Sequence, residues 1–323
     1  MNIKNLMHDW SKINFEEADL GELELTRDLS QRVTKEFDEL GISNARMDGY
    51  CTEKLPKTSE TGRGQNYSNI FHELLNSKNF SPSLFLAKYI KDYLANKLDP
   101  KRLNGFLARG LRTFASLLRE QDFANKIKNN LIKIDQNTRI KMDPEQDTKS
   151  HVDIKLFFKG NDFNIWTYQA SKNAIYPHTI ERVTGQRGEL EKGIHVLCPI
   201  STEQGQKLLI KRKSFKTQND RLNKWYKDLK NKKTKKQISD LQEKMKRKKN
   251  LIKEIGNEIK KLENETANID IVDGWFLYSN NYVDEISSMI GEFKKQKIFK
   301  YSDLSKTLLM PEKILRSVTF FEK

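Results

Sequence analysis

Two neighbouring segments in the middle of the chain carry side chains that could bind a divalent cation. Asp153 stands at the start of the first segment, 152–158, and Gln169 stands near the end of the second, 163–169. The alternating apolar residues and the Gly-Asn-Asp turn between the segments predict a β-hairpin. Because a hairpin places the start of one strand beside the end of the other, we expect the two polar side chains to lie side by side. Their oxygens are hard ligands of the kind that Mg²⁺ or Mn²⁺ prefers.

The two faces of this hairpin follow from the alternation of side chains along a strand. Asp153 is expected to project away from the apolar side chains of its own strand, which are Val152, Ile154, Leu156 and Phe158. One face of the second strand carries Ile165, Thr167, Gln169 and Ser171.

This arrangement resembles the core of the PD-(D/E)XK nuclease superfamily, which includes many restriction and phage-defence endonucleases. In that family an Asp opens the second core strand, and a Glu-x-Lys or Gln-x-Lys lies near the end of the third. A helix and a further strand follow. The resemblance implies that Asp153 is the metal-binding Asp and that Gln169 occupies the Glu or Gln position.

The lysine of the family motif has no direct counterpart in this chain. Ser171 occupies its position, and Lys172 follows one residue later. A residue shifted by one along a strand points to the other face, unless the strand has ended or a bulge re-aims it. Either Lys172 or Lys155 then takes the catalytic role of the lysine, or the fold has lost its activity.

The family often supplies a further acid from a helix before the core sheet. The resemblance implies Glu73 as this additional metal ligand, with Glu120 as the alternative, and nothing local selects between them. A second alignment takes Asp143 as the first acid and the Asp153-Ile-Lys run as the second pair. We prefer the first alignment because the polar segment 143–150 is typical of a loop.

Composition limits the class of protein. The chain has 323 residues, of which 36% are hydrophobic and 32% charged, and its two cysteines, Cys51 and Cys198, are far apart in sequence. This cysteine usage argues against a disulfide framework or a zinc site and favours a reducing compartment. No run approaches the ~18 apolar residues of a membrane span, and the first residues lack an apolar signal segment. We expect a cytoplasmic protein that makes no membrane contact.

Positive charge is concentrated in one part of the chain. The formal net charge is +15, and the segment 211–261 contains 20 Lys and Arg residues but only 6 Asp and Glu residues. A segment this basic attracts polyanions, chiefly nucleic acid, through phosphate neutralisation and counterion release. Nucleic-acid contacts are expected from Arg187, Lys211, Arg212, Lys213, Lys232, Lys233, Lys235, Lys236, Lys246 and Arg247.

The same segment has the spacing of long helices, because no Gly or Pro occurs between Gly205 and Gly256. Apolar residues repeat every seven positions from 238 to 262, with Lys248 as the one charged interruption, as in a coiled coil. A shorter stripe at 222–229 and a polar turn at 231–236 predict a helical hairpin that packs on itself. The alternative is a homodimer in which the seam pairs with a second chain.

These patterns predict an α/β (α+β) fold with a restriction-endonuclease-like core sheet flanked by helices. The expected regions are a helical N-terminal region (1–130), the first part of the nuclease-like core (131–213), an inserted basic coiled-coil hairpin (214–266), and the completion of the core (267–323). Within the core we expect a first strand in 132–142, a helix over 176–190, and a strand at 194–200 that continues through 207–210. A strand at 269–278 should rejoin the sheet, followed by a helix over 283–293.

Three functions fit these features. The first is a metal-dependent endonuclease that cleaves double-stranded DNA with Mg²⁺ or Mn²⁺, in restriction or phage defence, with the basic hairpin holding the substrate backbone. The second is an inactive protein of the nuclease fold that binds nucleic acid. The third is a coiled-coil interaction protein with an acidic partner. The residue at position 171 separates the first two, and salt-dependent DNA binding separates both from the third.

Overall fold

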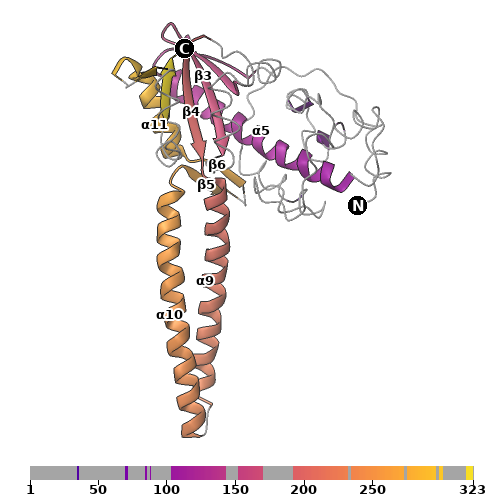
Figure 1. Cartoon of the computed structure of the whole chain (residues 1–323), viewed down its shortest axis with the longest axis vertical. Helices are drawn as coiled ribbons and strands as arrows, with labels where there is room; N and C mark the ends of the chain where they lie inside the picture. The colour runs from indigo at the N-terminus through magenta and orange to yellow at the C-terminus, as the bar shows by residue number, and fades with distance from the viewer. Residues whose placement is uncertain are drawn as a thin grey trace. The chain divides into compact units, whose positions relative to one another are not determined.

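The chain is described by a computed structural model, shown as a ribbon in Figure 1. The described residues are 35, 70–71, 84–85, 88, 103–142, 152–169, 192–231, 234–272, 275–295, 298–300 and 318–322. They fall into two compact units. The second unit is Glu203–Ala267, and the first unit contains the described residues before and after that segment.

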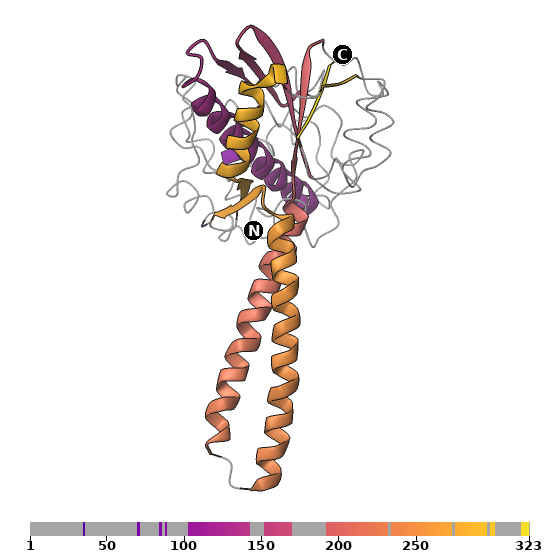
Figure 2. The same ribbon diagram turned by 90° about the vertical axis from the view of Figure 1, so that its left-hand side faces the viewer.

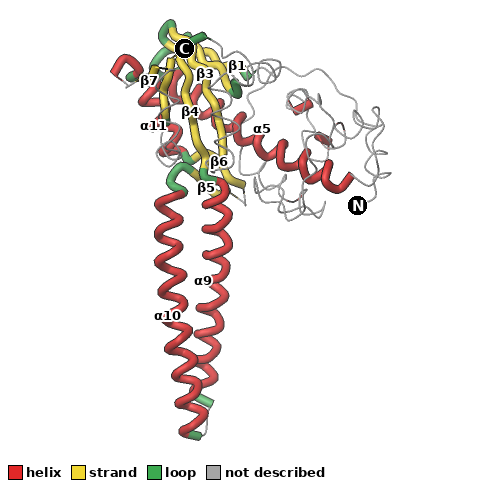
Figure 3. The backbone as a smooth tube through the Cα atoms, viewed as in Figure 1, coloured by secondary structure: helices red, strands yellow, loops and turns green. Residues whose placement is uncertain are grey.

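A mixed six-stranded sheet forms the centre of the first unit (Figure 3). Its strands are β1 (Arg139–Lys141), β2 (Ile154–Phe158), β3 (Asn161–Gln169), β4 (Ile194–Ile200), β7 (Ile298–Lys300) and β8 (Thr319–Glu322), in the order β1-β2-β3-β4-β8-β7. The pairs β3–β4 and β7–β8 are parallel, and the other neighbours are antiparallel. Helices together with a mixed sheet confirm the predicted α/β class.

A two-residue turn sets the register of the β2–β3 hairpin. Lys159 and Gly160 lie between the strands, and their φ angles are 48° and 77°. Positive φ at both turn positions matches the right-handed twist of paired strands. The Asp135 carboxylate accepts a hydrogen bond from the Lys159 N–H at 3.1 Å, so the segment before β1 holds this turn in place.

One face of the sheet packs against side chains near the end of α11 (Asn280–Gly291). Phe293, just after this helix, contacts Phe163 of β3 with ring centroids 5.1 Å apart and Phe320 of β8 at 6.0 Å. Direct Cα partners across β2, β3 and β4 share a face, as do residues two apart on one strand. This face, called the core face below, therefore carries Ile154, Leu156, Phe163, Ile165, Thr167 and Cys198.

The helix α5 (Leu103–Leu131) packs against a small separate sheet formed by β5 (Ile269–Val272) and β6 (Trp275–Tyr278). Phe123 of α5 stacks on Tyr278 of β6 with ring centroids 4.2 Å apart, and both side chains are fully buried. The Tyr278 hydroxyl donates a hydrogen bond to the Cys198 carbonyl of β4 at 2.9 Å. Tyr278 thus links the helix, the small sheet and the main sheet.

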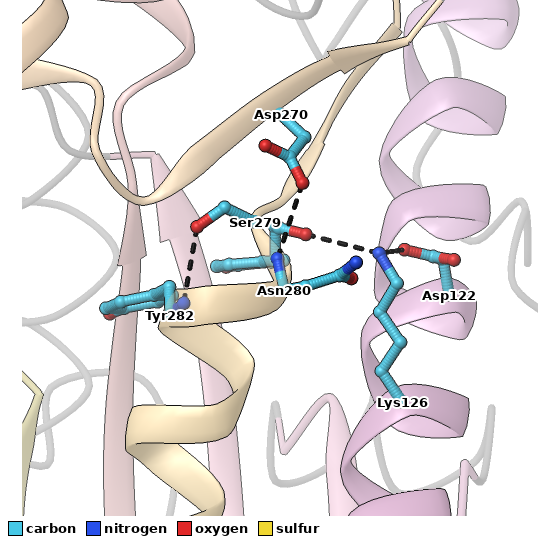
Figure 4. Close-up of polar contacts among 7 residues, drawn as sticks. Asp122, Lys126, Asp270, Ser279, Asn280 and Tyr282 are labelled. Carbon is cyan, nitrogen blue, oxygen red and sulfur yellow. Dashed lines mark hydrogen bonds and ion pairs between the residues drawn. The ribbon is translucent and has the colours of Figure 1, made fainter.

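A polar cluster fixes α5 to the start of α11 (Figure 4). The Lys126 ammonium lies 2.8 Å from the Asp122 carboxylate and donates to the Tyr278 carbonyl at 3.3 Å. Ser279 caps α11 by accepting a hydrogen bond from the Tyr282 N–H at 3.3 Å. Such a cap satisfies an N–H group for which the helix itself offers no acceptor.

The second unit contains two long helices that lie side by side (Figures 1 and 2). They are α9 (Thr202–Leu229) and α10 (Lys235–Glu265). Thr234 caps α10 by accepting a hydrogen bond from the Gln237 N–H at 3.3 Å. Three buried side chains of the second unit come from the predicted apolar stripes, namely Leu222, Met245 and Ile255. The structure therefore has the helical hairpin packed within one chain.

Several predicted elements are confirmed, including the β2–β3 hairpin, the strand at 194–200, the helix near 283–293 and the connection between the two long helices. The prediction of a strand at 207–210 is wrong. These residues lie in α9, and Leu208 is buried there. The predicted boundary at 213/214 also lies inside α9. In the first segment, 132–142, only 139–141 forms a strand.

The prediction that 269–278 rejoins the main sheet is also wrong. That segment folds on itself as β5–β6, and β8 with β7 completes the main sheet. The short strand β8 occupies the place beside β4, so the β5–β6 hairpin covers α5 instead. The predicted helix at 176–190 lies outside the described residues, as does most of 1–102. None of the described helices combines the length and apolar content that crossing a membrane requires.

Candidate functional site

The Asp153 carboxylate is held by β3. Its Oδ2 accepts two hydrogen bonds from Thr167, one from the backbone N–H at 2.6 Å and one from the hydroxyl at 3.0 Å. Asp153 lies in a bend just before β2 rather than within the strand. The prediction that its side chain leaves the hairpin on the face opposite to Ile154 is therefore corrected, because the bend turns the carboxylate toward Thr167 on the core face.

Gln169 lies two residues beyond Thr167, as the last residue of β3. Residues two apart on a strand share a face and lie about 7 Å apart. Gln169 therefore follows the partner of Asp153 along β3. The proximity of its side chain to the Asp153 carboxylate stays a prediction.

The surroundings of Asp153 are buried and contain several titratable groups. Burial raises the pKa of the Cys198 thiol, and the Asp153 charge raises it further. Burial also raises the pKa of the Tyr278 phenol, the Arg119 charge lowers it, and the charges of Glu120 and Asp153 raise it. Glu120 of α5 and Asp153 of the sheet therefore act on the same buried phenol.

Glu120 was the alternative to Glu73 as the acid from a preceding helix. Its Oε1 accepts a hydrogen bond from the Ser116 hydroxyl at 3.0 Å, and Ser116 in turn accepts one from Arg119 at 2.9 Å. Glu73 lies outside the described residues. The two hydrogen bonds at Glu120 and Ser116 therefore lie within α5.

The donor set can be compared with the needs of Mg²⁺. This ion keeps several water ligands and often binds one or two carboxylates, and Asp153 with the Gln169 amide provides hard oxygens of that kind. The described residues contain no cluster of three or more His, Cys, Asp and Glu side chains arranged for a metal ion. Mg²⁺ binding by Asp153 and Gln169 therefore stays a prediction.

The proposed lysines fall in different places. Lys155 has Lys141 and Asn164 as its Cα partners, so it lies on the face of the sheet opposite to Thr167. The register therefore places Lys155 on a different face from the side chain of Thr167, the hydrogen-bond partner of Asp153. Ser171, Lys172 and Arg187 lie outside the described residues.

The helical hairpin divides into two parts of different charge. The basal part (203–221 and 254–267) contains 8 Lys and Arg residues against 6 Asp and Glu residues, whereas the distal part (222–253) contains 13 against 3. In the basal part, Lys211 forms an ion pair with Glu258, and Arg212 pairs with Glu263 at 2.8 Å. These two cations were predicted to bind nucleic acid, and in the structure they connect the two helices.

In the distal part, aromatic rings take the place of the carboxylates. Lys248, the charged interruption of the seam, lies over the Trp225 ring at 5.5 Å and donates a hydrogen bond to the side-chain Oε1 of Gln218 at 2.7 Å. Lys249 lies over the Tyr226 ring at 5.3 Å. A cation over an aromatic face is stabilised but keeps its charge. The distal part therefore packs its helices together while retaining a net charge of +10.

The other cations predicted to bind nucleic acid are spread over both parts. Lys213 lies in the basal part, and Lys235, Lys236, Lys246 and Arg247 lie in the distal part. Arg247 forms an ion pair with Glu243 on its own helix. Lys232 and Lys233 lie outside the described residues.

Sequence reasoning did not identify Thr167 or Tyr278 as parts of this site. The sequence predicted that Thr167 shares a strand face with Gln169. Its hydrogen bonds to the Asp153 carboxylate depend on the bend at residue 153 and were not predicted. Tyr278 is 125 positions from Asp153 in the numbering, and no local pattern connects them. Comparison with known proteins adds no relative, because no family model, no curated protein and no solved structure gives a significant match to the chain.

Proposed function

We propose that this protein is a metal-dependent endonuclease that cleaves phosphodiester bonds in DNA, with Asp153 and Gln169 as metal ligands. The observation that carries the proposal is the Asp153 carboxylate, which accepts two hydrogen bonds from Thr167, two residues before Gln169 on β3. The strand arrangement supports it, since an antiparallel β2–β3 hairpin is followed by β4 parallel to β3. The resemblance to the PD-(D/E)XK superfamily implies a hairpin, a helix and a further strand, and the segment of the expected helix lies outside the described residues.

In this proposal each residue has a separate task. Asp153 and Gln169 would hold Mg²⁺ or Mn²⁺, and Thr167 fixes the orientation of the Asp153 carboxylate. An ion held there would polarise a phosphoryl oxygen and lower the pKa of the attacking water. Glu120 adds negative charge from α5, and the role of the family lysine goes to Lys172, since Lys155 lies on the opposite face.

The distal part of the hairpin retains the substrate. Its helical segment 235–253 spans about 28 Å at 1.5 Å per residue, most of the ~34 Å length of one turn of duplex DNA. Lysine and arginine side chains along it bind phosphates without reading the base sequence. This division of tasks separates cleavage in the first unit from retention in the second.

A cleavage assay on supercoiled plasmid tests the proposal. Wild-type protein should nick the plasmid in Mg²⁺ or Mn²⁺, and Asp153→Ala should not, while both should retain labelled duplex to a similar degree. Glu292→Gln is the matched control, because Glu292 is an exposed acid at the end of α11, and it should cleave normally. Absence of cleavage by wild type with either ion on several DNA and RNA substrates refutes the proposal.

The second candidate function is a nucleic-acid-binding protein without cleavage. Ser171 in the lysine position of the motif favours it. It predicts DNA retention that falls steeply with salt and no metal-dependent nicking. An interaction protein with an acidic protein partner would instead leave plain duplex DNA unretained at all salt concentrations.

A further inference from the structure

The face of the main sheet opposite to the core face contains a hollow with a cationic lining. Its volume is about 320 Å³, and it lies over β1, β2 and β3. The charged side chains in its lining are four cations and one carboxylate, namely Arg139, Lys141, Lys155, Lys192 and Asp162. A volume of this size is at the lower end of the range for sites that bind small molecules.

The strand register explains why these charges gather in one place. Lys141, Lys155 and Asn164 are Cα partners across β1, β2 and β3. The next row on the same face is formed by Arg139, Phe157 and Asp162. Paired residues and residues two apart project from one face of a sheet, so the two rows form a continuous surface beside the hollow.

The position of Lys192 is fixed by backbone contacts. The following residue, Gly193, has a φ of 130°, a conformation that favours glycine. A Cβ at this position would lie 3.4 Å from the Asn164 amide nitrogen and 3.4 Å from the Asp162 carbonyl oxygen. The buried Asn164 amide also donates a long hydrogen bond of 3.5 Å to the Lys192 carbonyl. Lys192 is thereby held directly beside β3.

Phe157 gives this surface an exposed aromatic ring. Its side chain is 39% exposed, whereas the neighbouring Leu156 and Phe158 are almost completely buried. Sheet surfaces that bind single-stranded nucleic acid combine an aromatic ring that stacks on a base with cations that bind the phosphates. In a duplex the faces of the bases are covered by their neighbours, so the ring favours an unpaired strand.

We propose that this hollow binds one nucleotide of a single-stranded nucleic acid. The base lies on Phe157, and the adjacent phosphates are bound by Arg139, Lys141, Lys155 and Lys192. The inference rests on the proposed nucleic-acid substrate and adds that an unpaired strand contacts the face of the sheet opposite to Asp153. It requires no metal and no cleavage.

Photo-crosslinking tests this placement on the full-length protein. The probe is a strand of six thymidine nucleotides with one central 5-iodouracil, irradiated with the protein in EDTA so that no metal-dependent cleavage occurs. Mapping by mass spectrometry should place an adduct on Phe157. Phe157→Ala should lose that adduct and bind the strand about tenfold more weakly, as expected when an aromatic stacking partner is removed.

Charge variants and competitors complete the test. Single-strand binding is measured over a range of salt concentrations, and the logarithm of the binding constant is plotted against the logarithm of the salt concentration. The double variant Lys141→Ala with Lys155→Ala should reduce the magnitude of the slope by about 1.4. The exposed control pair Lys133→Ala with Lys294→Ala should leave the slope unchanged. Unlabelled single strand should suppress the Phe157 adduct at concentrations where duplex or free thymidine monophosphate does not. Adducts confined to α9 and α10, or equal suppression by duplex or by the mononucleotide, overturn the proposal. Either result leaves the Asp153 cleavage assay unaffected, so the two proposals fail independently.

Discussion

The two faces of the β2–β3 hairpin differ in chemistry although they come from the same short sequence. The core face carries a carboxylate that is fixed by two hydrogen bonds from Thr167. The opposite face carries Lys155 and an exposed Phe157 beside a cationic hollow. Alternation along the strands produces this division, and the bend at Asp153 is the one departure from it. The two proposals assign separate roles to these faces, with metal binding on one and strand binding on the other.

Separating cleavage from binding is the strongest way to break this comparison. Asp153→Asn should lower kcat by at least about 1000-fold with little change in substrate affinity, because it weakens binding of the ion on which catalysis depends. Lys155→Ala should raise KM and leave kcat within about twofold, because it removes an interaction that is equally strong in the ground and transition states. Steady-state nicking kinetics measure both. A loss of kcat in Lys155→Ala would contradict the assignment of the two faces.

The helical hairpin of α9 and α10 is also divided, into a basal and a distal part of different charge. Removing charge from each part tests whether they differ in duplex binding. The variant changes four lysines of the distal part to Gln, namely Lys244, Lys246, Lys249 and Lys253. In duplex binding, the slope of the logarithm of the binding constant against the logarithm of the salt concentration should fall in magnitude by up to about 3.6, at ~0.9 for each phosphate that the variant no longer neutralises. The control changes Lys207, Lys213, Lys216 and Lys260 of the basal part to Gln and should have a clearly smaller effect. Equal effects of the two sets would show that net charge, and not position, determines binding.

Thr167 tests how the core face positions its carboxylate. Thr167→Val removes the hydroxyl donor and leaves the backbone N–H donor, so unfolding should become easier by about 1 kcal/mol. Cleavage should fall by roughly tenfold, and Thr167→Ser should restore most of it because the hydroxyl returns. Denaturant unfolding and nicking rates measure the two effects. A variant with lowered stability but normal cleavage would restrict Thr167 to a structural role.

A substitution of Asp135 should have the smallest effect on stability. Its carboxylate accepts a hydrogen bond from the turn that joins β2 and β3. The backbone N–H groups of Asn137 and Lys159 lower the pKa of its carboxyl below the usual 3.8. A carboxyl with a lowered pKa stabilises the fold above pH 3.8, and this contribution is lost as the pH falls through the lower value in the folded state. Asp135→Ala should therefore unfold slightly more easily than wild type at pH 7, with a difference that shrinks below pH 4. A difference independent of pH would contradict this account.

Local patterns predicted the elements that depend on local interactions. The β2–β3 hairpin followed from alternation and a turn, and the long helices followed from the absence of Gly and Pro and from their seven-residue spacing. Pairings between distant segments were not predictable in this way. The short strands β8, which pairs with β4, and β7, which pairs with β8, lack a strong periodic signal. The β5–β6 segment has strand composition whether it joins the main sheet or packs on α5.

The candidate site was predictable to the same extent. The pairing of β2 and β3 was visible in the sequence, and so was the choice of Asp153 and Gln169. The orientation of the Asp153 side chain was not predictable, because it depends on a bend just before β2 and on hydrogen bonds from Thr167. The cationic hollow was also missed, since its charges come from three strands and from Lys192, which only the register brings together.

Binding of Mn²⁺ measured by electron paramagnetic resonance tests the central claim most directly. The full-length protein is titrated with the ion, alone and with duplex DNA, and compared with Asp153→Ala and the control Glu292→Gln. We expect wild type and the control to bind Mn²⁺ at a site that Asp153→Ala lacks. Equal binding by all three proteins, or none by wild type under either condition, would contradict metal binding at the Asp153 carboxylate.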